Sequence, residues 1–130
     1  MPVTDCGFPR PVAAMCADLA GQGFDVLDQQ RDADQQLLVL QGPVRQGRRW
    51  LEAFVRISAE RGSWSIAMRF EGMSRWIPAR SWRAYLDGVA PAEPDLEGQA
   101  SFVRYRLSEA AGAIGATPQA ERELVRLSGG

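Results

Sequence analysis

Carboxylates and arginines are the side chains of this sequence that offer the most chemistry, because its 130 residues include no histidine and no lysine. All fifteen basic residues are therefore arginine. This composition excludes histidine-based acid–base catalysis, histidine-assisted nucleophiles and Schiff bases on lysine. The two cysteines, Cys6 and Cys16, lie outside any closely spaced redox or zinc motif. Because the sequence shows no secretion signal, we expect both thiols to be reduced.

One pair of carboxylates is placed for acid–base work. Glu52 and Glu71 fall on two neighbouring predicted strands, and like-charged neighbours can raise the pKa of one partner. Nothing else in the sequence completes a catalytic set, and Gly21 and Gly23 precede a predicted strand, the wrong order for a phosphate-binding turn. We therefore expect neither enzymatic activity nor a cofactor, and hydrolysis by the two glutamates is the third of three hypotheses.

Four aspartates form an acidic candidate site, namely Asp25, Asp28, Asp32 and Asp34. Carboxylates in a turn can hold Ca²⁺ or Mg²⁺. This run lacks the glycine and the terminal glutamate of an EF-hand loop, so no metal is expected. We interpret it instead as an acidic docking face for a basic partner, where charge mainly sets the association rate and the specificity.

Basic residues concentrate in the middle third of the chain. Residues 45–83 carry nine arginines and three glutamates, a net charge of +6, whereas residues 1–44 and 84–130 have net charges of −4 and −3. All four tryptophans also lie in the middle segment. Arginine forks bind anions in a bidentate manner, and aromatic rings stack on bases. The candidate residues for binding a partner or a phosphate are Arg45, Arg48, Arg49, Arg75, Trp76, Arg80 and Arg83.

Two interpretations of this arginine- and tryptophan-rich segment compete. One is nucleic-acid or nucleotide binding through residues 69–83. In the other, Trp64 and Trp82 belong to the hydrophobic core, and the arginines pair with acids of the flanking segments. The net charge of −1 and the lack of any nucleic-acid-binding motif favour the second interpretation.

The element that must position these side chains is a β-hairpin. Every odd-numbered residue from 51 to 59 is apolar, and so is every even-numbered residue from 64 to 70. Successive strand side chains point to opposite faces, so both apolar sets share one face only if Ala59 pairs with Trp64. This predicts a loop of two or four residues in which Gly62 takes a positive φ.

The rest of the chain predicts further strands and helices around the hairpin. Gly42-Pro43 is expected to end a short strand, and Ser101 is expected to cap a helix. In chain order, the expected elements are a helix from Pro11 to Gly21 or Gly23, strands at 24–30 and 37–40, a loop at 44–49, the hairpin, a loop or edge strand at 72–77, a helix at 78–87, an acidic loop at 89–98, a helix at 101–114 and a last helix from Thr117-Pro118.

The predicted fold class is α+β: an antiparallel meander sheet of four, or five, strands, with an N-terminal helix and C-terminal helices packed against it. One domain spanning residues 1–130 is expected at this length. No apolar run is long enough for a signal peptide or a membrane span, so we expect a cytoplasmic protein without membrane contact. Arginine without lysine, with abundant alanine and glycine, indicates a GC-rich bacterial genome.

A short single domain with a meander sheet, helices and no catalytic set is similar in kind to small bacterial partner-binding proteins, which include toxin-neutralising immunity proteins and secretion chaperones. The resemblance concerns the fold only. It implies a non-enzymatic protein that binds another protein, such as a toxin or an effector. The alternative hypothesis is a nucleic-acid or nucleotide binder that uses Arg75, Arg80 and Arg83.

Overall fold

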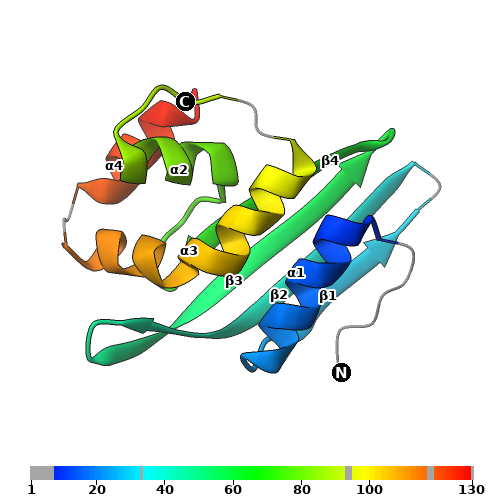
Figure 1. Cartoon of the computed structure of the whole chain (residues 1–130), viewed down its shortest axis with the longest axis horizontal. Helices are drawn as coiled ribbons and strands as arrows, with labels where there is room; N and C mark the ends of the chain where they lie inside the picture. The colour runs from blue at the N-terminus through cyan, green and yellow to red at the C-terminus, as the bar shows by residue number, and fades with distance from the viewer. Residues whose placement is uncertain (1–7, 33, 93–94, 117–118, 130) are drawn as a thin grey trace.

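The chain forms an antiparallel five-stranded sheet with helices from both ends of the sequence packed against it (Figure 1). The computed structural model describes residues 8–32, 34–92, 95–116 and 119–129. The strands lie in chain order, which confirms the predicted α+β meander and gives it five strands. The elements are α1 (Arg10–Gly21), β1 (Asp25–Arg31), β2 (Gln35–Gln46), β3 (Arg49–Glu60), β4 (Ser63–Phe70), β5 (Ile77–Pro78), α2 (Ala79–Asp87), α3 (Leu96–Ala116) and α4 (Ala120–Leu127).

The β3–β4 hairpin has the register that the alternating pattern predicts. Ala59 pairs with Trp64, so the apolar side chains of both strands share one face. The loop has two residues, Arg61 at φ 52° and Gly62 at φ 82°. Two left-handed residues in succession give a turn whose twist matches that of the strands. The predicted short loop with Gly62 at a positive φ is confirmed, and the arginine beside it is strained.

Strand β2 is longer than predicted, because Gly42-Pro43 does not end it. The strand continues through both residues, and the predicted loop at residues 44–49 instead extends the sheet and turns at Gly47. At position 42 a Cβ would lie 2.8 Å from Cδ2 of Phe24 and still closer to two other ring carbons. Glycine is therefore required there by a close approach of the ring, and close approach is one of the recognised reasons for glycine inside a strand.

Pro43 is tolerated in the strand because neither neighbour needs its missing N–H. It pairs with Glu52, whose amide donates to Oε1 of Glu71 at 2.7 Å and whose carbonyl accepts from the Glu71 amide at 2.9 Å. The backbone of Glu52 therefore faces β4 and requires no bond from position 43. On the other side, β1 begins at Asp25, opposite Gln41 and two residues short of Pro43.

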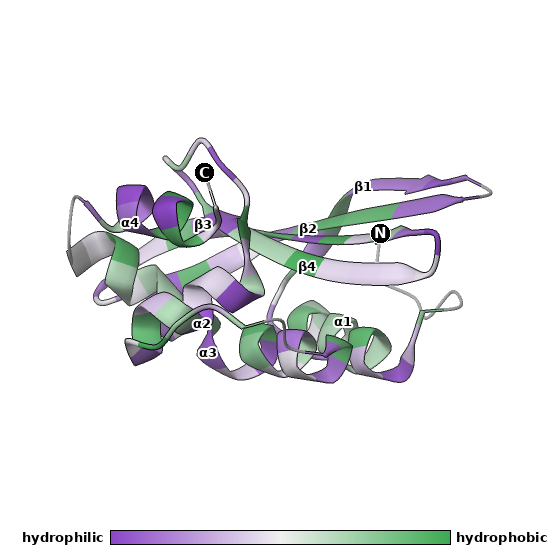
Figure 2. Cartoon of the chain, turned by 90° about the horizontal axis from the view of Figure 1, so that it is seen from above, coloured by the Kyte–Doolittle hydropathy of each residue, from purple (hydrophilic) through white to green (hydrophobic). Residues whose placement is uncertain are grey.

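Helices α1, α2 and α3 lie on one side of the sheet, and the hydrophobic core fills the space between (Figure 2). Trp82 of α2 is 0% exposed, meets the ring of Phe70 edge to face at 5.4 Å, and donates from Nε1 to the carbonyl of Met68 at 3.3 Å. The predicted core position is therefore confirmed for Trp82, whereas Trp64 is partly buried and packs against the edge of the same core. Cys6 lies outside the described residues. The predicted stripe of α1 is buried: Val12, Met15, Cys16 and Leu19.

Helix α3 begins five residues earlier than predicted. Asp95, and not Ser101, caps its N-terminus, because Oδ1 of Asp95 accepts a hydrogen bond at 2.7 Å from the amide three residues on. Ser101 consequently lies inside the helix, on its exposed side. Residues 96–98, the last residues of the acidic loop predicted at 89–98, belong to α3. The helix start predicted at Thr117-Pro118 lies outside the described residues.

Residues 72–77, which the sequence left open as a loop or an edge strand, form mainly a loop. The strand β5 is only two residues long and pairs with Ala67 and Met68 of β4. Beyond β5, the amide of Ile66 donates to Oε1 of Gln99 in α3 at 2.8 Å. A helix side chain thus satisfies part of the outer edge of β4, a common protection for a sheet edge.

Candidate binding surface

The face of the sheet turned away from α1, α2 and α3 is here named the open face. Side chains alternate between the two faces along each strand. Val55 and Met68 pair with each other and are 0% exposed on the helix side. Their neighbours Phe54, Arg56 and Arg69 therefore lie on the open face. The register places Arg69 of β4 directly opposite Phe54 of β3.

An arginine–aromatic cluster, consisting of Phe54, Arg56, Arg69 and Trp76, occupies the middle of the open face. The guanidinium carbon of Arg69 lies 4.3 Å from the ring centroid of Phe54 and 5.2 Å from that of Trp76. The guanidinium carbon of Arg56 lies 5.0 Å from the Trp76 centroid. The loop between β4 and β5 supplies Trp76, and the Met73 carbonyl in this loop accepts a hydrogen bond from Nη1 of Arg69 at 3.2 Å.

The two guanidinium groups of the cluster make no ion pair within the part of the chain that the structure describes. Both arginines and both rings are half-buried. Burial lowers the pKa of Arg56, because a less polar environment disfavours the charged form, yet an arginine stays protonated in proteins. The cluster therefore presents two positioned cations whose charge the described acids do not neutralise.

Two carboxylates border the cluster on one side. Glu52 lies two positions along β3 from Phe54, and Glu71, the residue after β4, lies two positions from Arg69, which is about 7 Å of extended chain in each case. Oε1 of Glu71 accepts from the Glu52 amide at 2.7 Å, and Oε2 of Glu52 accepts from Nε2 of Gln41 at 3.2 Å. Both carboxylates therefore act as hydrogen-bond acceptors and form an acidic rim at this edge of the cluster.

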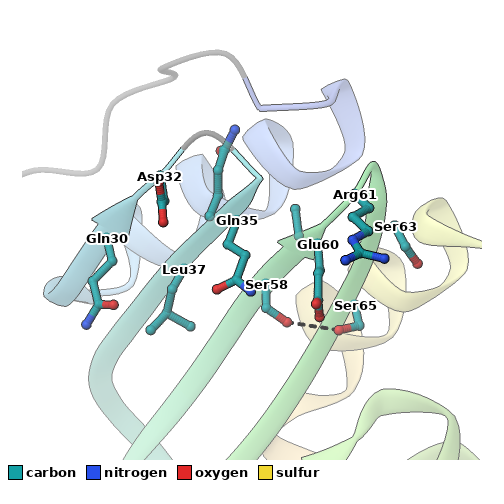
Figure 3. A pocket seen from close by; sticks show the side chains of 11 residues that line it. Gln30, Asp32, Gln35, Leu37, Ser58, Glu60, Arg61, Ser63 and Ser65 are labelled. Atoms are coloured by element: carbon teal, nitrogen blue, oxygen red, sulfur yellow. Dashed lines mark hydrogen bonds between the residues drawn. The ribbon is translucent and has the colours of Figure 1, made fainter.

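A shallow pocket of about 510 Å³ lies at the other end of the open face, beside the β3–β4 turn (Figure 3). The carboxamides of Gln30 and Gln35 line it around the side chain of Leu37. Oγ of Ser58 and Oγ of Ser65 are 3.0 Å apart and share a hydrogen bond. Most of the side chains that line this pocket are polar.

The four predicted acidic residues follow the outer edge of the sheet. Asp25 and Asp28 belong to β1, Asp32 and Asp34 belong to the turn after it, and all four are exposed. A strand rises about 3.3 Å per residue, so the first and third of these lie about 20 Å apart. Within the described residues, no group of three or more Cys, Asp or Glu could hold a metal ion. A docking role for this edge stays a prediction.

The predicted basic residues are divided among three parts of the molecule, and only Trp76 of that set joins the cluster. At the tip of the β2–β3 hairpin, the guanidinium of Arg45 lies 5.1 Å from the ring of Trp50, which is 61% exposed. On α2, Nε of Arg83 lies 3.8 Å from Oδ2 of Asp87. The hairpin tip carries Arg45, Arg48 and Arg49. The loop before β5 carries Arg75, and helix α2 carries Arg80 and Arg83.

Sequence reasoning did not name Arg56 or Arg69, the two cations of the cluster, among the candidate site residues, although Arg69 is the first residue of the segment 69–83 that the alternative hypothesis uses. A signal for one contact was present, because the register that pairs Ala59 with Trp64 also sets Arg69 opposite Phe54 on the outward side. Nothing in the alternating pattern placed Trp76 beside them, since that residue reaches the sheet from an irregular loop.

Comparisons with protein-family models, with characterised proteins and with solved structures found no match for this chain. Within the described ranges, no helix combines the length and the apolar character that crossing a membrane requires.

Proposed function

We propose that this chain is a non-enzymatic protein-binding domain that engages its partner through the open face. The arginine–aromatic cluster carries the proposal. Aromatic residues and arginine are enriched at protein interfaces and dominate their binding energy. Here they are half-buried and held in contact with one another before any partner arrives. Binding would then require little further ordering of side chains, which favours affinity.

Nucleic-acid binding through residues 69–83 is the alternative, and the geometry of the cluster weighs against it. Bases stack on ring faces, but guanidinium groups lie over the rings of Phe54 and Trp76. A phosphate backbone crossing the cluster would also approach the carboxylates of Glu52 and Glu71. The remaining arginines of the segment are divided between a loop, which carries Arg75, and helix α2, which carries Arg80 and Arg83.

The partner we propose is another bacterial protein, a toxin or a secreted effector, bound in the cytoplasm as immunity proteins and secretion chaperones bind theirs. The separation of charge supports a protein partner. Asp25 and Asp28 follow the edge strand β1, whereas the cluster in the middle of the open face is cationic. Surfaces with such a pattern steer a complementary protein and reject others.

Affinity capture with the purified chain tests this proposal. Wild type, Arg56→Gln/Arg69→Gln and the control Arg75→Gln/Arg83→Gln serve as baits for lysate of the native host, and captured proteins are identified by mass spectrometry. We expect wild type and the control to retain one protein that the open-face variant loses. The purified pair should then form a complex of defined stoichiometry in light scattering.

Two results, one from this capture and one from a separate oligonucleotide-binding assay, would contradict the proposal. A captured protein that binds the open-face variant as well as wild type would place the interface elsewhere. Salt-dependent binding of oligonucleotides that disappears in Arg75→Gln/Arg83→Gln would favour the nucleic-acid alternative.

A further inference from the structure

We infer that the partner docks acidic side chains, Asp or Glu, onto the exposed edges of Arg56 and Arg69, from a segment that is otherwise apolar or basic. This inference rests on the proposed protein-binding function and names the chemistry of the partner. It follows from the hydrogen-bond donors that the cluster leaves unused, from the carboxylates around it and from the apolar side chains beside it.

The unused donors point to a planar anion. A guanidinium group has five N–H donors in its plane. The rings of Trp76 and Phe54 lie over the guanidinium groups, so the donors project sideways from the stack. Arg69 gives one N–H to the Met73 carbonyl, and Arg56 donates no hydrogen bond within the described residues. A carboxylate matches the fork of such donors in a bidentate manner.

The surrounding charges select single carboxylates over a polyanion. Glu52 and Glu71 lie about 7 Å along the chain from Phe54 and Arg69, within the distance over which exposed charges interact at physiological salt. Asp28 stands two strands from Arg56, since both pair with Val39. A chain of phosphates would meet repulsion on two sides. A single acidic residue would be attracted by the arginines of the cluster. Basic residues beside it in the partner would be attracted by the carboxylates of the rim.

The side chains beside the cluster add an apolar requirement. Val39 and Ala67 point to the open face next to Arg56, where their neighbours already leave them only 8% and 6% exposed. Leu37, further along the same face in the lining of the polar pocket, is only half-buried and therefore offers apolar surface to a partner. The partner segment should therefore carry an apolar residue close to its acidic one, because burying both together excludes water from the ion pair.

Selection from a library of short random peptides, displayed on their own messenger RNA, tests this inference with the full-length chain. Peptides are selected on wild type and counter-selected on Arg56→Gln/Arg69→Gln. We expect enriched peptides to carry Asp or Glu beside an apolar residue. Replacing that acid by its amide should weaken binding about tenfold or more, and Arg69→Gln should weaken it to a similar extent.

Matched variants separate the carboxylate contact from general damage. Arg10→Gln, at the exposed start of α1 on the helix side of the sheet, should leave peptide affinity unchanged, and circular dichroism melts should show that every variant is folded. Arg69→Lys keeps the charge but loses the fork, so an intermediate loss is expected. In a double-mutant cycle, the amide peptide should respond little to Arg69→Gln.

Other outcomes would overturn the inference. These are the selection of acid-free peptides, the absence of enrichment over the counter-selection, or equal effects of Arg69→Gln on the acidic and the amide peptide. Acid-free peptides that compete with the captured host protein would leave protein binding by the open face intact and remove only the carboxylate contact. Loss of the host-protein complex itself would instead contradict the proposed function.

Discussion

Gly42 is the position where one added methyl group gives the sharpest check of the fold. Its Cα faces the ring of Phe24, which is 1% exposed and belongs to the hydrophobic core. A Cβ at position 42 would lie 2.8 Å from Cδ2 of the ring and closer still to two neighbouring carbons, distances that real Cβ atoms do not show. Either the ring or strand β2 must move.

We expect Gly42→Ala to destabilise the protein by about 2–3 kcal/mol, the upper part of the range for overpacked cores. The clashing group is a buried ring, and the short connection between α1 and β1 that carries it leaves the ring little room to move. For a chain of this size this corresponds to a fall in Tm of about 10 °C. Gly112→Ala is the matched control, since nothing lies within 4 Å of a Cβ there and the residue is inside α3. That change should stabilise the helix by about 0.5–1 kcal/mol.

Urea unfolding, followed by circular dichroism, measures both effects. Phe24→Leu provides the internal test, because a smaller side chain removes atoms that the new methyl group would strike. In the Phe24→Leu background, Gly42→Ala should be milder by about 1 kcal/mol or more. Equal effects of Gly42→Ala in both backgrounds, or a Gly42→Ala variant as stable as wild type, would refute the placement of the ring and the course of β2 through Gly42.

Three further results are expected from the same structure. Arg61→Asn should raise the free energy of unfolding in urea by about 1 kcal/mol, because asparagine tolerates the left-handed conformation of this turn better than arginine does. Arg106 donates hydrogen bonds to Asp87 and Glu109 and thereby lowers the pKa of both carboxyls. The stability that these groups contribute is present at neutral pH and is lost as the pH falls below about 4, so Arg106→Gln should reduce the drop in the urea midpoint on acidification. Trp76→Leu removes the tryptophan contacts of both cluster arginines; it should weaken binding of the selected peptides at least about tenfold in calorimetry while lowering stability by only about 1–2 kcal/mol.

Alternation of side chains accounts for most of the fold that the sequence could predict. The parity argument placed Ala59 opposite Trp64 and left only a short even loop, and both features are present. Glycine and proline misled the same reasoning at Gly42-Pro43, where the backbone stays in the strand. Their acceptance depends on a ring from residue 24 and on the bonding of Glu52, which are contacts between segments distant in sequence.

The helix starts show the same division between local and distant information. Ser101 and Asp95 are both acceptable caps by residue type. Local preference alone does not rank them, and the helix begins at the earlier one. The earlier start adds Gln99 to α3, whose side chain binds the β4 edge at Ile66. A contact across the molecule therefore accompanies the longer helix.

The candidate site escaped prediction for a related reason. Charged and aromatic residues on the outward side of β3 and β4 look like an ordinary solvated face when each strand is considered alone. Their arrangement depends on the loop that brings Trp76 between them, and the loop is held by the bond from Arg69 to the Met73 carbonyl. Stacked guanidinium groups cover rings that would otherwise expose apolar surface, so the same contacts that make the face tolerable in water also orient its donors. A substitution that removes the stacking should therefore weaken binding more than it lowers stability, whereas a substitution in the core behind this face should act mainly on stability.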